Sequence, residues 1–174
     1  NQSNDDAVVR QAIDEMHALG LEVMLKPHVD VHDGTWRAQI TPANAAAWFA
    51  SYTAFMYHYT AIAAEKNVAM LCIGTELGSM SGSAHAGQWS ALIARIRSRY
   101  SGLLTYASNG VSAADEFTSV SFWSQLDLIG ADVYTPLTNG TNPTRAELVA
   151  AWRRNRDGND MVASFRNLQQ AYGK

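Results

Sequence analysis

An uninterrupted apolar segment lies near the middle of the chain and reads Val68-Ala-Met-Leu-Cys-Ile-Gly74, followed directly by Thr75 and Glu76. A strand that is apolar throughout is typical of a parallel sheet whose two faces are both covered. Further β-prone segments at 21–27, 103–107 and 126–134 predict three more strands. The chain is therefore expected to build a four-stranded parallel sheet.

Helical segments are predicted between these strands, which is the alternation of an α/β architecture. Asn4 or Asp5 can cap a first helix, and Thr41-Pro42 is a typical start for a long second one. The remaining helical segments are expected at 87–100, 117–122, 144–152 and 160–172. Parallel strands joined by right-handed helical crossovers predict a (β/α) barrel of TIM type, here about half a barrel, as a single domain over residues 1–174.

Polar side chains gather at the carboxyl end of every predicted strand. They are Lys26, His28 and Asp30 for the first strand, Glu76 for the second, Asn109 for the third, and Asp132 and Tyr134 for the fourth. The carboxyl ends of parallel strands meet at one edge of the sheet, where loops and helix N-termini build sites. Four strands that end this way predict one site at this edge.

Glu76 is the candidate catalytic residue. With a period of two, Cys72, Gly74 and Glu76 share one face of the strand, so that Glu76 projects above two small residues. Burial raises the pKa of a carboxyl group, which suits a general acid near neutral pH. The alternative is a purely structural ion pair of Glu76 with Lys26 or Arg37.

His28, Asp30 and His32 alternate along the loop after the first strand and offer a second chemistry. Alternate residues of an extended segment face the same way, and imidazole and carboxylate groups bind divalent metals. A metal-dependent barrel hydrolase that uses these three residues is therefore an alternative enzyme class. The leading interpretation needs no metal and no cofactor.

Composition and charge argue against two classes of partner. Thirteen Lys and Arg against sixteen Asp and Glu give a net charge of −3, whereas nucleic acid and anionic membranes require a basic face. No apolar stretch approaches the roughly 20 residues that a membrane span needs. The one cysteine, Cys72, lies in an apolar strand and is expected in the core, so it does not indicate a compartment.

Four segments carry a family resemblance. They are Lys-Pro-His-Val-Asp-Val-His-Asp-Gly-Thr-Trp-Arg at 26–37, Ile-Gly-Thr-Glu-Leu at 73–77, Thr-Tyr-Ala-Ser-Asn at 105–109 and Asp-Leu-Ile-Gly-Ala-Asp-Val-Tyr-Thr-Pro-Leu at 127–137. Together they resemble glycoside hydrolase family 113, a β-mannanase family of the retaining clan A barrels. The resemblance implies a (β/α)₈ fold with Glu76 as general acid/base. The substrate-binding residues expected from it are Lys26, His28, Asp30, Trp36, Asn109, Asp132 and Tyr134, with Arg37 added as a further candidate.

The resemblance covers strands three to six of that barrel only. A retaining glycosidase needs a second carboxylate as nucleophile, about 5–5.5 Å from the acid/base. The family places it at the end of strand seven, which has no counterpart here, so Asp132 is the best partner carboxylate within the chain. Half a barrel leaves two strand edges unpaired, and we therefore also expect self-association through these edges.

The sequence thus predicts a glycoside hydrolase that acts on β-linked oligo- or polysaccharides. β-Mannan is the substrate that the resemblance implies, and β-galactosides and β-glucosides are its alternatives. Because the nucleophile has no counterpart in the chain, a non-catalytic carbohydrate-binding barrel fragment is the alternative function.

Overall fold

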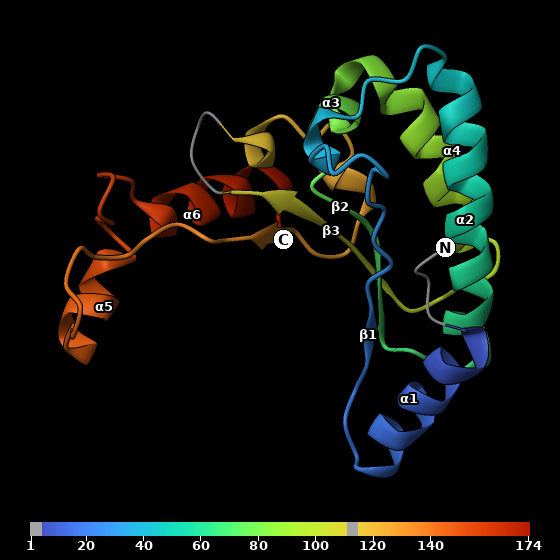
Figure 1. The fold of residues 1–174 in the computed structure, drawn as a ribbon, viewed down its shortest axis with the longest axis horizontal. Coiled ribbons are helices and arrows are strands. Elements are labelled where there is room, and N and C mark those ends of the chain that lie inside the picture. The colour runs from blue at the N-terminus through green and yellow to red at the C-terminus, as the bar shows by residue number, and fades with distance from the viewer. Residues whose placement is uncertain (1–4, 111–114) are drawn as a thin grey trace.

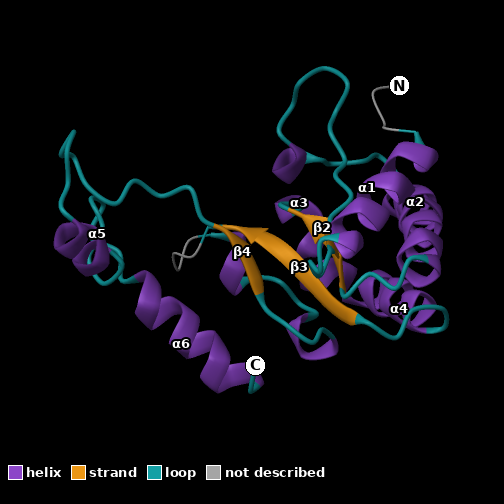
Figure 2. Cartoon of the chain, turned by 90° about the horizontal axis from the view of Figure 1, so that it is seen from below, coloured by secondary structure: helices purple, strands orange, loops and turns teal. Residues whose placement is uncertain are grey.

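A computed structural model describes residues 5–110 and 115–174, in which four parallel strands form one sheet. The strands are β1 (Met24–Leu25), β2 (Met70–Thr75), β3 (Leu103–Asn109) and β4 (Gly130–Asp132), and they lie side by side in this order. All three neighbouring pairs are parallel, as the alternation of strands and helices predicts. The sheet is open, because β1 and β4 each pair with one neighbour only (Figures 1 and 2).

Three helices accompany the first strands: α1 (Asp6–Ala18), α2 (Ala45–Glu65) and α4 (Ala86–Arg97). Figure 1 shows α2 and α4 lying against each other on one side of the sheet. The Tyr52 hydroxyl of α2 donates a hydrogen bond to the Ile73 carbonyl of β2, 2.8 Å away. Aromatic rings fill the layer between these helices and the sheet, with Trp89 stacked on Phe122 at 4.3 Å between ring centroids. The core therefore lies on this side of the sheet.

Short helical segments occupy the loops that follow the strands. They are the 3-10 helices η1 (Arg37–Gln39), η2 (Ser83–His85), η3 (Glu116–Thr118) and η4 (Trp123–Gln125), and the single turn α3 (Gly78–Ser81). The predicted helical turn at 117–122 overlaps the last two residues of η3 and ends just before η4, so its bounds differ from those of the structure. Because η1, α3 and η3 follow the carboxyl ends of β1, β2 and β3, they shape the edge at which the site was predicted.

The last two helices, α5 (Arg145–Ala151) and α6 (Met161–Tyr172), extend away from the α2–α4 side (Figure 1). Thr144 caps α5, as predicted, in a capping box with Glu147. The α6 helix packs on the rest through Phe165, whose ring lies 5.2 Å from that of Phe117. In the described ranges, no helix has both the length and the apolar character needed to cross a membrane.

Of two predicted helix starts, one is confirmed and the other differs from the structure. Asp5 caps α1 through its side chain, whereas the alternative cap Asn4 lies outside the described residues. The long helix begins at Ala45 and not at Pro42 with Thr41 as its cap, because the Asn44 side chain accepts a hydrogen bond from the Ala47 N–H. The Thr41 hydroxyl donates to the Gln39 carbonyl at 2.8 Å, so Thr41 closes the preceding 3-10 turn.

The strict alternation predicted for the second strand was also wrong. The register between β2 and β3 shifts between Cys72 and Thr75, which inserts an extra residue into β2. A Cβ atom on Gly74 would lie 2.7 Å from the Tyr106 ring and 3.0 Å from the Tyr52 hydroxyl, in the aromatic layer beneath the helices. Gly74 therefore faces the helices and does not share an inner face with Cys72.

Candidate active site

The backbone at Glu76 turns sharply where β2 ends. Glu76 has φ of 51°, in the left-handed region that a residue with a Cβ rarely adopts. Its N–H donates to the Ala107 carbonyl of β3 at 2.8 Å, and the next N–H, that of Leu77, donates to the Tyr106 hydroxyl at 2.7 Å. Both contacts come from β3, so the neighbouring strand fixes the direction in which the Glu76 side chain leaves the sheet.

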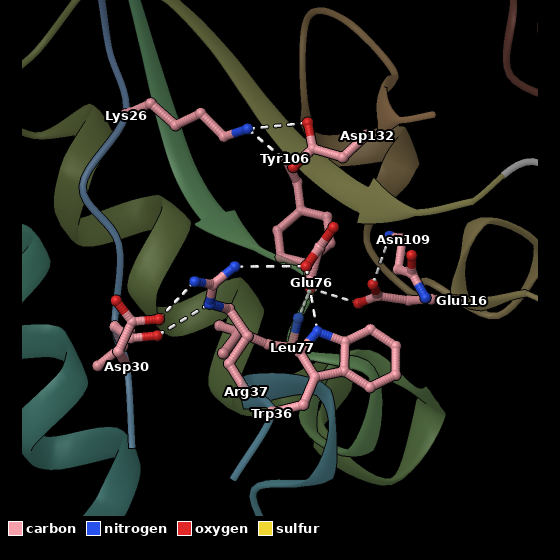
Figure 3. A network of polar contacts seen from close by, with 11 residues as sticks. Lys26, Asp30, Trp36, Arg37, Glu76, Leu77, Tyr106, Asn109, Glu116 and Asp132 are labelled. Atoms are coloured by element: carbon pink, nitrogen blue, oxygen red, sulfur yellow. Dashed lines mark hydrogen bonds and ion pairs between the residues drawn. The ribbon is translucent and has the colours of Figure 1, made fainter. Parts of the chain in front are cut away.

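The Glu76 carboxylate is largely buried, with 12% of its side chain exposed, and one oxygen carries its contacts. Oε2 accepts from the Trp36 indole N–H at 3.2 Å and from Arg37 Nη1 at 3.3 Å (Figure 3). Among the described residues, Oε1 accepts no hydrogen bond. One oxygen is therefore held and the other is available to a ligand.

Arg37 provides the ion pair that was considered as the structural alternative for Glu76. Its guanidinium also donates to the Val29 carbonyl at 3.0 Å and to the Asp30 carboxylate. These contacts join the loop after β1 to the end of β2, at the carboxyl edge of the sheet. Lys26, the other partner considered for Glu76, pairs with a different carboxylate.

Lys26 and Asp132 form a second ion pair at this edge. Lys26 follows β1 and Asp132 ends β4, and Lys26 Nζ lies 2.8 Å from each carboxylate oxygen of Asp132. Their side chains are 23% and 20% exposed. Nearby, burial lowers the pKa of His28, and the positive charges of Arg37 and Lys26 lower it further. His28 is therefore neutral near pH 7 and can both donate and accept hydrogen bonds.

Glu116 is a fourth carboxylate of the site, after Glu76, Asp30 and Asp132, and the sequence interpretation missed it. The Tyr106 hydroxyl donates to one of its oxygens, and the Asn109 N–H donates to the other at 2.8 Å. Burial raises the pKa of Glu116 and the charge of Glu76 raises it further, whereas hydrogen bonds from Tyr106, Asn109 and Ser81 oppose the shift. The Tyr106 hydroxyl, which donates to Glu116, also accepts the Leu77 N–H directly after Glu76, so Glu116 lies at the same strand end as Glu76.

The sequence profile described as Glycoside Hydrolase Family 113 matches residues 1–169. The chain belongs to glycoside hydrolase family 113. It covers half of that family's barrel, because its four parallel strands and their helices superpose on about half of each solved relative.

Three solved structures of the family are similar to this chain. The β-mannanase AaManA from Alicyclobacillus acidocaldarius, in complex with ManMIm, is 32% identical with a TM-score of 0.80 over 98% of this chain and 49% of that one. A GH113 β-1,4-mannanase is 28% identical with a TM-score of 0.76 over 97% and 49%. A complex of a GH113 β-1,4-mannanase is 28% identical with a TM-score of 0.78 over 99% and 52%. No curated protein sequence matches the chain.

This family 113 chain brings most of its predicted site residues to one edge. Trp36, Arg37 and Asp30 join Glu76 in one network, and Lys26 and Asp132 form the other. The Asn109 N–H donates to Glu116, whose other oxygen accepts the Tyr106 hydroxyl. By contrast, Tyr134 is 88% exposed and contacts neither network within the described residues. Trp36 is 46% exposed and so offers a ring face for stacking.

The loop after β1 does not gather metal ligands. Within residues 5–110 and 115–174, no group of three or more His, Cys, Asp and Glu side chains could hold a metal ion. The Asp30 carboxylate is bound by Arg37 instead, and His32 is exposed. His28, Asp30 and His32 therefore form no metal-binding group in this part of the chain, and the metal-dependent alternative stays a prediction.

Proposed function

We propose that this chain is the acid/base half of a family 113 barrel that hydrolyses β-linked mannose polymers, with Glu76 as the proton donor. One observation carries the proposal: a largely buried carboxylate at the carboxyl edge has Oε2 held by Trp36 and Arg37, while Oε1 accepts no hydrogen bond from the described residues. The substrate follows from the solved relatives, which are β-mannanases.

In the proposed reaction, the protonated Glu76 carboxyl gives its proton from Oε1 to the glycosidic oxygen as the bond to the sugar breaks. The resulting carboxylate then takes a proton from the water that attacks the glycosyl intermediate. The contact from Arg37 is single and long at 3.3 Å, and this guanidinium has two further acceptors. A sugar hydroxyl can therefore replace it without leaving Arg37 unpaired.

The nucleophile is assigned to the half of the barrel that these 174 residues do not cover. The chain spans about half the length of the solved structures, at 49% to 52% of each. Both oxygens of Glu116 already accept hydrogen bonds, and both oxygens of Asp132 face Lys26. We therefore assign Asp132, together with Lys26 and His28, to binding sugar hydroxyls and not to nucleophilic attack.

The role of Glu76 can be tested on the chain itself with N-bromoacetyl-β-mannosylamine, which places an alkylating carbon where the leaving oxygen would lie. The Glu76 carboxylate should displace bromide and form an ester, identified by peptide mass spectrometry. Mannobiose should slow this reaction, and bromoacetamide, which lacks the sugar, should not reproduce it. Glu76→Gln should remove the ester, whereas Glu147→Gln, an exposed glutamate in the α5 cap, should leave it unchanged.

Alkylation of Glu76 that mannobiose does not slow, or that bromoacetamide matches, would rule out a sugar site at this carboxylate. A measurement of mannan hydrolysis then distinguishes the hydrolase from the carbohydrate-binding alternative. The 174 residues are placed in a β-mannanase relative in exchange for its matching half. Glu76→Gln in this chimera should lower mannan hydrolysis roughly 10²- to 10⁴-fold, with smaller losses for aryl mannosides that have activated leaving groups. Sugar binding without turnover, and no loss on replacing Glu76, would favour the binding function.

Two finer predictions stay open to direct measurement. Aryl β-mannosides, β-galactosides and β-glucosides compared on the chimera test the sugar preference, and we expect the mannoside to react fastest. Self-association of the isolated chain through β1 and β4 would give about twice the monomer mass in light scattering. Light scattering that shows a compact monomer would rule out self-association. The free edges of β1 and β4 would then be the places where the remaining strands of the barrel pair.

A further inference from the structure

The left-handed backbone at Glu76 needs partners that hold it, because a side chain with a Cβ disfavours this region. The partner that follows Glu76 is the Tyr106 hydroxyl, which accepts the Leu77 N–H at 2.7 Å. Tyr106 and Leu77 are each 0% exposed, so water cannot replace this hydrogen bond. The Tyr106 hydroxyl is therefore the side-chain contact that, together with the Ala107 carbonyl, fixes the Glu76 turn.

Glu116 in turn holds the Tyr106 hydroxyl. A phenol that accepts one hydrogen bond has its own proton left to donate, and that proton goes to Glu116. The second Glu116 oxygen accepts the N–H of Asn109 at 2.8 Å, so the carboxylate contacts β3 twice and reaches the end of β2 only through the Tyr106 hydroxyl (Figure 3). Glu116 is only 9% exposed, and nothing in its contacts requires it to touch a sugar.

We propose that Glu116, acting through the Tyr106 hydroxyl, is a positioning residue that fixes the Glu76 carboxyl for proton transfer. The proposal rests on the proposed function of Glu76. Glu116 contributes no proton to the reaction, and its effect reaches Glu76 through the Leu77 backbone.

The electrostatics of the pair agree with this role. Burial raises the pKa of Tyr106 well above its usual range, and the neighbouring Glu116 charge raises it further. The phenol therefore keeps its proton and can donate to Glu116 over the working pH range. A hydrogen bond between a phenol and a carboxylate is short and strong when desolvated, which suits a contact that must fix a geometry.

The test uses two variants and a matched control in the mannosylamine labelling assay. Tyr106→Phe deletes the hydroxyl. Glu116→Gln keeps the shape, but the amide has a single carbonyl oxygen, so it cannot accept from both Tyr106 and Asn109. Tyr100→Phe is the control, because it deletes another buried hydroxyl, which donates to the Val68 carbonyl at 2.7 Å.

Both variants should lower the maximal alkylation rate of Glu76 roughly ten- to a hundredfold, because small displacements of a reacting group have effects of this size. The reagent concentration at half-maximal rate should stay within about twofold, since the sugar contacts are unchanged. The double variant should be no slower than the slower single one, as expected for residues that act in series. Tyr100→Phe should label like the wild type.

Wild-type alkylation rates in both variants, or additive losses in the double variant, would overturn the positioning role. Amide hydrogen exchange at Leu77 gives a second readout that does not depend on labelling. It should become faster in Tyr106→Phe and in Glu116→Gln but not in Tyr100→Phe, and unchanged protection of Leu77 in the first two would also overturn the role. If the wild type is not labelled at all, the proposed function fails while the Leu77 exchange still tests the contact.

Discussion

Replacing Gly130 with alanine should destabilise the chain, because β4 approaches β3 too closely for a side chain. A Cβ atom at Gly130 would lie 2.6 Å from the Tyr106 carbonyl oxygen and 2.9 Å from the Thr105 hydroxyl oxygen. Carbon and oxygen atoms in close contact normally lie about 3.3–3.6 Å apart, so the overlap with the carbonyl is several tenths of an ångström. The carbonyl belongs to the β3 backbone, which cannot move aside as a flexible side chain can.

Forced overlaps of this kind cost about 1–3 kcal/mol in unfolding free energy. For a chain of this size, each kcal/mol lowers the melting temperature by roughly 2–4 °C. Urea unfolding followed by circular dichroism would measure the change. The matched control is Gly140→Ala, where the nearest atom is the Thr138 hydroxyl oxygen at 3.5 Å and the expected change is within about 0.5 kcal/mol. If Gly130→Ala and Gly140→Ala unfold at the same urea concentration, the close packing of β4 on β3 is wrong.

Three further predictions concern charge and metal. Lys26→Met should lower the unfolding free energy by about 1–3 kcal/mol, because it leaves the partly buried Asp132 carboxylate unpaired. Adding Asp132→Asn to this variant should recover part of the lost stability in urea titrations. No recovery in the double variant would contradict the pairing of Lys26 with Asp132. Burial alone would raise the pKa of Asp127, but hydrogen bonds from the Leu104 N–H and from Arg97 lower it on balance. Its stabilisation is therefore present above the unfolded pKa of about 3.9 and is lost as the pH falls through the lower folded value, so the stability difference between wild type and Asp127→Asn should shrink on acidification. Finally, a chelator should leave alkylation of Glu76 unchanged, and loss of alkylation that zinc restores would favour the metal-dependent alternative.

The sequence predicts the sheet well because the hydrophobic pattern of the chain indicates where its strands lie and that they alternate with helices. The apolar run that contains Ile73 forms a central strand, and all four predicted strands are present in parallel. The outer strands are shorter than predicted, at Met24–Leu25 and Gly130–Asp132, because each has only one neighbour with which to form hydrogen bonds. Strand ends depend on such pairing partners, which a pattern of residue types does not contain.

For the candidate site, the sequence likewise predicted the location of the residues but not their contacts. Strand ends located Glu76, Lys26 and Asp132 at one edge of the sheet, because the edge follows from topology. The sequence did not predict how these side chains pair. Lys26 contacts Asp132 across two intervening strands, whereas Arg37 forms the ion pair with Glu76. Glu116 was missed because it lies in a short 3-10 helix, and only the three-dimensional structure brings it to the Tyr106 hydroxyl.

The contact between Lys26 and Asp132 joins the outermost strands, which are 106 residues apart in the chain. A flat sheet would hold those two strands too far apart for a lysine to reach, so this end of the sheet is curved where the ion pair spans it. The curvature that a barrel requires is thus present before closure. A barrel assembled from two halves would add its later strands to a template that is already curved, and a high salt concentration, which screens the two charges, should slow that assembly step.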